Sequence, residues 1–153
     1  MNGRSRMANP DSRQIKDYYE KKDLIGRGAF GEALTVKRLS DGAMFIMKKE
    51  KILIAQIEKR KRKDEVNALK KCDHPHIVRY VDDFIDESYS RIVMEYCTEG
   101  DVGDFLKRQK GNLLSTQALL IWAMDLASGM AYLKTQRIVH RDLVLETTIK
   151  LYP

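Results

Sequence analysis

The stretch Ile25-Gly26-Arg27-Gly28-Ala29-Phe30-Gly31 stands between two segments that have the composition of β-strands. Residues 19–25 precede its glycines and residues 32–39 follow them, and Ser40-Asp41-Gly42 then predicts a hairpin before a third strand at 44–48. Because a strand follows the last glycine, the pattern favours antiparallel hairpins over a dinucleotide-binding fold, in which a helix would follow. The glycines alone fit either a phosphate-binding loop or a plain glycine-rich hairpin.

The next part of the chain predicts one helix and two more strands. Residues 51–72 contain neither Gly nor Pro and predict a helix, which His74-Pro75 ends. Further strands are expected at 77–85 and 90–96, around the turn Asp86-Glu87-Ser88. The sequence therefore predicts a sheet of five strands with one main helix.

Two helices are expected after a linker at residues 98–100. A short helix covers 101–110, and a longer one runs from Ser115 or Thr116 to Lys134. The longer helix is apolar on more than one face, so we expect it to leave an apolar surface in water at Leu119, Leu120, Trp122, Leu126 and Met130. One more short strand is expected at 148–152.

Composition and charge limit the classes of function. The chain has 153 residues, 43% hydrophobic and 33% charged, and no apolar run long enough to span a membrane. Its net charge of +6 includes the run Lys59-Arg60-Lys61-Arg62-Lys63. Such a run can bind nucleic acid or act as a nuclear-import signal, but we favour a solvated helix face. We expect no nucleic-acid partner, because no aromatic side chains interleave with the run. Two cysteines indicate a reducing compartment, the cytoplasm, with cytoskeletal or nuclear association as alternatives.

The ordered set of motifs is more specific than any one of them. It comprises the three glycines, Lys48, Glu65, His74-Pro75, Met94-Glu95-Tyr96-Cys97 and His140-Arg141-Asp142. In this order and spacing the set resembles the protein kinase family from Tyr18 onward. Within that family the chain is similar to the NIMA-related (NEK) serine/threonine group. The residues that carry this resemblance are Ala33, in the strand after the glycine loop, and Ile46, two residues before Lys48.

The resemblance implies an α+β, protein-kinase-like fold. We expect a disordered basic tail at 1–17, a kinase N-lobe at 18–96 with a five-stranded antiparallel sheet and one main helix, and a hinge with a partial helical C-lobe at 97–153. The catalytic loop at 139–147 would belong to that C-lobe. The Asp-Phe-Gly motif of the family is expected beyond Pro153, so the chain is interpreted as truncated before it.

The resemblance also implies an ATP site. Lys48 would donate to the α- and β-phosphates and be fixed by Glu65, while Asp142 would orient the accepting hydroxyl. Lys49, next to Lys48, leaves an ambiguity of register that strand alternation should resolve. The other residues expected to contact ATP are Ile25, Gly26, Arg27, Gly28, Ala29, Phe30, Gly31, Ala33, Ile46, Met94, Glu95, Cys97, Asp101 and Ile149.

Two positions depart from the family's catalytic loop. Val144 stands where a lysine neutralises the transferring phosphoryl group, and Thr147 stands where an asparagine binds a metal ion. Mg²⁺ is thus implied by family while its usual ligands are missing or replaced, and no metal ligand is assigned. We expect a serine/threonine kinase-like, ATP-binding domain with weak or no activity toward a protein substrate. A pseudokinase-like module that binds a protein partner, or a truncated product without function, remain the alternatives.

Overall fold

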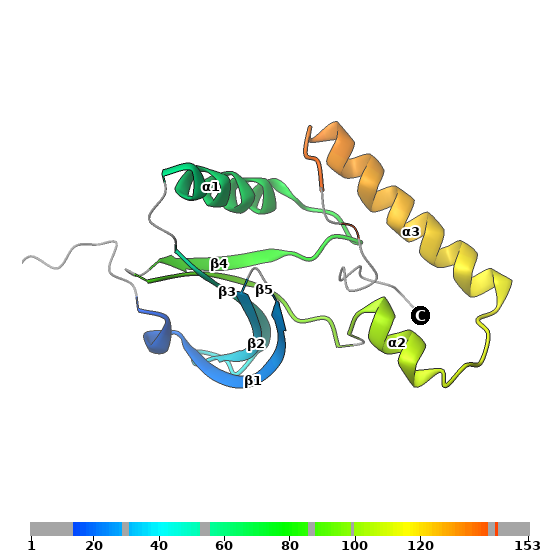
Figure 1. Cartoon of the computed structure of the whole chain (residues 1–153), viewed down its shortest axis with the longest axis horizontal. Coiled ribbons are helices and arrows are strands. Elements are labelled where there is room, and N and C mark those ends of the chain that lie inside the picture. Colours follow the sequence, from blue (N-terminus) through cyan, green and yellow to red (C-terminus); the bar gives the residue numbers. More distant parts are fainter. Residues whose placement is uncertain are drawn as a thin grey trace, which may run out of the picture.

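The computed structural model describes residues 14–28, 31–52, 56–85, 88–98, 100–140 and 143, with the backbone alone for 56–62. Its elements in chain order are η1 (Ile15–Asp17), β1 (Tyr19–Gly28), β2 (Gly31–Arg38), β3 (Met44–Lys51), α1 (Gln56–Lys71), β4 (Tyr80–Ile85), β5 (Tyr89–Glu95), α2 (Val102–Arg108) and α3 (Thr116–Thr135). Figure 1 shows α1 beside the sheet, and α2 and α3 together at the other end of the molecule.

The five strands form one antiparallel sheet in the order β1-β2-β3-β5-β4, which confirms the predicted sheet. Two rows of paired residues are important for the site. One row joins Gly26, Ala33, Lys48 and Ile92, and the next joins Thr35, Ile46, Met94 and Tyr80. Directly paired residues project to the same face of a sheet, so each row lies on one face. The two rows are two residues apart along β2, β3 and β5, so they lie on the same face as each other.

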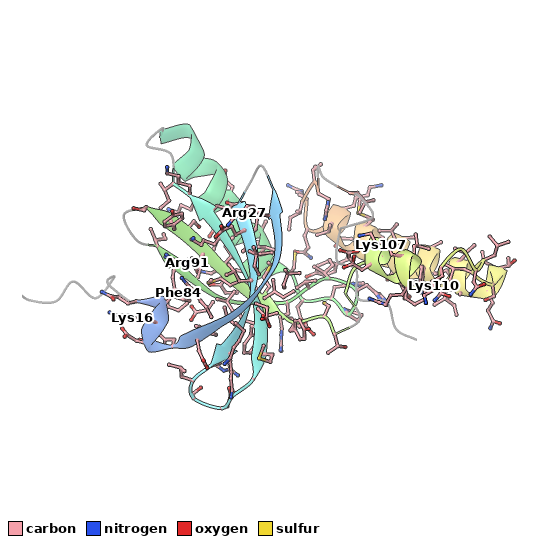
Figure 2. The ribbon with its side chains drawn as sticks, turned by 60° about the horizontal axis from the view of Figure 1, so that its bottom comes forward. Lys16, Arg27, Phe84, Arg91, Lys107 and Lys110 are labelled. Carbon is pink, nitrogen blue, oxygen red and sulfur yellow. The ribbon has the colours of Figure 1, made fainter. Side chains whose placement is uncertain are left out.

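The opposite face carries the hydrophobic core. Its buried residues are Tyr19, Val36, Phe45, Met47, Phe84 and Val93, and Ile15 from η1 packs against them. The Tyr19 ring meets the rings of Phe45 and Phe84 edge-on, with centroids 6.1 and 5.8 Å apart. In Figure 2 Phe84 lies on the part of the sheet next to η1. Strand alternation thus places Met47 in this core and Lys48 on the other face.

The C-terminal end of α1 is tied to β4. Lys70 forms an ion pair with Asp83 (Nζ–Oδ1 2.7 Å) and lies 5.0 Å from the centroid of the Tyr80 ring. The Tyr80 hydroxyl donates to Asp83. Burial, together with this hydrogen bond, raises the pKa of Tyr80 to about 12, so the phenol stays a donor throughout the physiological range. These contacts fix the end of the helix that follows Glu65.

The long helix α3 is attached to the loop between α1 and β4. The Tyr132 hydroxyl accepts from the Asp73 amide (2.9 Å) and donates to the Lys71 carbonyl (3.1 Å). His76 Nε2 lies 3.5 Å from Asp125 Oδ1. The short helix α2 joins the same unit because its Phe105 ring meets the Trp122 ring of α3 edge-on at 5.0 Å.

Several predicted boundaries differ from the structure. The helix expected from residue 51 begins at Gln56, because Lys51 still pairs with Tyr89 at the end of β3. The strand expected from 77 begins at Tyr80, because Ile77 donates to His74 in a turn (3.1 Å). Ile15–Asp17, which fall within the predicted tail, form the short helix η1. The strand expected at 148–152 and residues 1–13 lie outside the described residues.

The prediction of an apolar surface on α3 is partly right. Leu119, Leu120 and Met130 are exposed, but Trp122 and Leu126 are half-buried, the former against Phe105. Met124 and Ile121, which were not predicted, are exposed as well. Over the part of the chain that the structure describes, no helix combines the length and the hydropathy needed to cross a bilayer.

Candidate functional site

Lys48 is the centre of the candidate site. Its ammonium lies 2.8 Å from Glu65 Oε1 of α1 and 2.7 Å from Glu50 Oε1 of its own strand. The expected contact between Lys48 and Glu65 therefore forms, and it joins the sheet to the helix. Lys49 projects to the other face, where it pairs with Glu32 at 3.0 Å and lies 4.2 Å from the centroid of the Tyr89 ring. The ambiguity between the two lysines is thereby resolved in favour of Lys48.

The two carboxylates keep Lys48 charged. Burial by itself would lower the pKa of this ammonium, but the hydrogen bonds to Glu50 and Glu65 outweigh burial and raise the pKa. Lys48 is thus a cation at every physiological pH. A cation that is fixed by a helix and partly removed from water is suited to bind an anionic group such as a phosphate.

Three of the expected apolar contacts lie on the face of Lys48. Ala33 is paired directly with Lys48, and Ile46 and Met94 are paired with each other in the next row. All three side chains are only partly buried, so they leave apolar surface beside the cation. An apolar surface next to one fixed charge can accommodate a flat heterocycle that carries phosphates.

The fold requires glycine at Gly31, but it leaves space for a side chain at Gly26 and Gly28. Gly31 has φ +136°, and a Cβ there would lie 2.2 Å from the Lys49 carbonyl oxygen. At Gly26 and Gly28, by contrast, a Cβ would meet nothing within 4 Å among the described residues. Because Gly26 shares a row with Lys48, this open space lies on the cation's face of the sheet. The backbone there is accessible to a close-fitting ligand.

The other side chains expected near the loop are placed differently. Arg27 donates to Glu32 (Nη2–Oε1 2.7 Å), which also pairs with Lys49, so Arg27 belongs to the face away from Lys48. In Figure 2 Arg27 lies near the end of the β1–β2 hairpin. Ile25 is half exposed, at a shift of the β1–β2 register between Leu24 and Gly26. The predicted turn over 26–31 is shorter than expected, since Gly28 already pairs with Gly31.

The segment after β5 carries the residues expected to contact the edge of the ligand. The Glu95 amide donates to the Arg79 carbonyl at 2.9 Å. The Cys97 carbonyl accepts from the Gly100 amide at 3.2 Å, which fixes the turn that leads to α2. Asp101 is the N-cap of α2, where its Oδ1 accepts from the Asp104 amide at 2.7 Å. This cap accounts for Asp101 structurally, without a ligand.

Four of the expected site residues, namely Ala29, Phe30, Asp142 and Ile149, lie outside the described residues. The replaced positions Val144 and Thr147 lie outside them too. Within the described ranges, no group of three His, Cys, Asp or Glu side chains is arranged to bind a metal ion. The cation, the apolar surface and the open glycine backbone around Lys48 could accommodate the organic part and the phosphates of a nucleotide.

Sequence reasoning missed Glu50. It lies two residues beyond Lys48 on β3, so the alternation of strand side chains places both on one face. The alternation of side chains along β3 was the feature of the sequence that could have identified Glu50. The motif spacing drew attention only to Glu65, because Glu65 stands in the predicted helix.

A family model described as protein tyrosine and serine/threonine kinase matches residues 19–147. The chain belongs to the protein kinase family. It is 35% identical over 127 residues to serine/threonine-protein kinase Nek3 of Mus musculus and 37% identical over 130 residues to Nek5 of Homo sapiens. Both matches cover 83% of this chain, but 24% and 18% of those relatives. The kinase chain thus spans a quarter or less of the length of these curated relatives, and its resemblance to the NEK group is confirmed.

Proposed function

We propose that the face of the sheet around Lys48 binds ATP, as the nucleotide site of a serine/threonine protein kinase domain. The observation that carries the proposal is the ion pair between Lys48 of β3 and Glu65 of α1 at 2.8 Å. It fixes one cation beside an apolar surface and a stretch of accessible glycine backbone. ATP would supply the phosphoryl group, and a protein with a Ser or Thr hydroxyl would accept it.

The residues around Lys48 would have distinct roles in binding ATP. Lys48 would donate to phosphate oxygens, and Glu65 would keep the ammonium in place. The backbone at Gly26 and Gly28 would approach the phosphates, because no Cβ intervenes. A second group of residues would contact the purine and ribose: the side chains of Ala33, Ile46, Met94 and Asp101 and the backbone of Glu95 and Cys97.

Transfer of the phosphoryl group is a separate matter. Val144 replaces a cation and Thr147 replaces a metal-binding amide in the family's catalytic loop. We therefore propose that the chain binds ATP but transfers phosphate weakly or not at all. The second candidate function, a nucleotide-binding module that acts through protein contacts, is favoured by these two replacements. The two cysteines, Cys72 and Cys97, are not joined in a disulfide, which supports a reducing compartment such as the cytoplasm.

ATP is expected to raise the melting temperature of the chain. A ligand at about 100 times its Kd stabilises a folded protein by about 2.7 kcal/mol, which corresponds to several degrees for a chain of this size. Lys48→Ala should abolish the shift, because it removes the cation that faces the phosphates. The measurement is thermal unfolding at increasing ATP concentration.

Lys49→Ala is the matched control for that experiment. It removes an equal charge from the neighbouring residue, whose side chain pairs with Glu32 on the opposite face. The chain with Lys49→Ala should keep the ATP-dependent shift. An equal loss of the shift in both variants, or no shift in the unaltered chain, would contradict the proposed site.

A further inference from the structure

Lys48 is shared between two carboxylates rather than held by one. Glu50 and Glu65 both lie within 2.8 Å of its ammonium, Glu50 from two residues along the same strand and Glu65 from α1. An ammonium has three N–H donors, so the two carboxylates leave one N–H for the two phosphates that Lys48 is proposed to contact. We propose that Glu50 is a positioning residue that holds Lys48 and competes with the phosphates of ATP for it. This inference rests on the proposed function.

The charges around the two neighbouring lysines support the competition. On the face of Lys48, one cation meets two carboxylates, so the group carries a net charge of −1. On the opposite face the arrangement is reversed, because the Glu32 carboxylate meets both Lys49 and Arg27. The glycine loop therefore has an anionic group on the face where an anionic ligand is proposed to bind. That arrangement disfavours the phosphates as long as Glu50 keeps its contact.

The partial burial of Glu50 makes its repulsion of the phosphates stronger than that of an ordinary surface carboxylate. Its side chain is 22% exposed, against 38% for Glu65. A charge with little solvent around it is screened less by water and salt. Glu50 is also on the same strand as Lys48, so its contact does not depend on the placement of α1. When ATP binds, Glu50 must yield part of the ammonium, whereas Glu65 keeps its contact.

Glu50→Gln is the variant that separates charge from shape. The amide has nearly the same volume but no charge, so it can still accept a hydrogen bond from Lys48. We expect the Kd for ATP to fall roughly 3- to 10-fold, which is the effect of removing one like charge near the phosphates. The Kd for adenosine, which has no phosphates, should not change. Isothermal titration calorimetry with ATP and with adenosine measures both values.

Glu20→Gln is the control with the same change of net charge. In the register of the sheet, Glu20 of β1 lies opposite Lys37 of β2, and Lys37 lies opposite Met44 of β3. Glu20 is therefore level with the beginning of β3, whereas Glu50 is near the end of β3. This variant should bind ATP as the unaltered chain does. Thermal unfolding without ligand checks that both variants fold.

The outcomes separate the inference from the proposed function. Tighter ATP binding in Glu50→Gln with unchanged adenosine binding supports the competition. Unchanged or weaker ATP binding in that variant, while the unaltered chain binds ATP through Lys48, overturns the role of Glu50 and leaves the nucleotide site in place. An equal gain for ATP and adenosine also overturns it, because the effect would then not involve the phosphates. Failure of both chains to bind ATP overturns both proposals.

Discussion

Replacement of Gly31 by Ala is expected to destabilise the chain by at least about 1–3 kcal/mol, the usual effect of a strained backbone conformation. Gly31 has φ +136°, which residues with a side chain rarely adopt. An added Cβ would also lie 2.2 Å from the Lys49 carbonyl oxygen, so β2 and β3 would have to separate locally. Unfolding in urea, followed by circular dichroism, measures the loss.

Gly28→Ala is the matched variant for this prediction. A Cβ at Gly28 meets no described atom within 4 Å, and its φ lies outside the range that favours glycine. Its stability should change far less than that of Gly31→Ala, while its affinity for ATP should fall if the phosphates approach that backbone. Equal destabilisation by the two substitutions would contradict the distinction between a glycine for the fold and a glycine for the ligand.

Transfer of phosphate by this chain is expected to be lower by a factor of at least about 100 than by an active kinase of the NEK group. Each lost electrostatic contact to a reacting group typically reduces the rate roughly 10²- to 10³-fold. Val144 and Thr147 remove one such contact each, since neither can supply a cation or a metal-binding amide. The measurement is incorporation of labelled γ-phosphate into a generic basic protein.

The control for the transfer assay is Asp142→Asn, which removes the carboxylate expected to orient the accepting hydroxyl. The unaltered chain and this variant should both give the background rate. Transfer by the unaltered chain that is lost in Asp142→Asn would show that the catalytic loop works despite its replacements. In that case the chain would be an active kinase, and the second candidate function would be excluded.

Local sequence patterns were sufficient for one part of the site, because the period of two along β3 predicted that Lys48 and Lys49 project to opposite faces. The same period also contained the signal for Glu50. The contact between Lys48 and Glu65 was predicted from the resemblance to the kinase family, and the structure contains it. The antiparallel sheet followed from the hairpin turns, because short connections between strands permit few other topologies.

Contacts between distant parts of the chain were the ones that the sequence did not reveal. The start of α1 was predicted too early because β3 continues to Lys51 through its pairing with Tyr89 of β5. The burial of Trp122 depends on Phe105 from another helix, and the position of α3 depends on Tyr132, which bonds to residues 71 and 73. None of these partners follows from local propensity, because tertiary packing decides them.

The affinity for ATP in a double-mutant cycle of Lys48 and Glu65 tests whether this ion pair organises the nucleotide site. Calorimetry would give the Kd of the unaltered chain, Lys48→Ala, Glu65→Gln and the double variant. We expect each single substitution to weaken ATP binding about 10-fold or more, and Glu65→Gln to have little further effect once Lys48 is absent. If Glu65→Gln leaves the affinity unchanged in the presence of Lys48, or if the two effects simply add, the ion pair does not organise the nucleotide site.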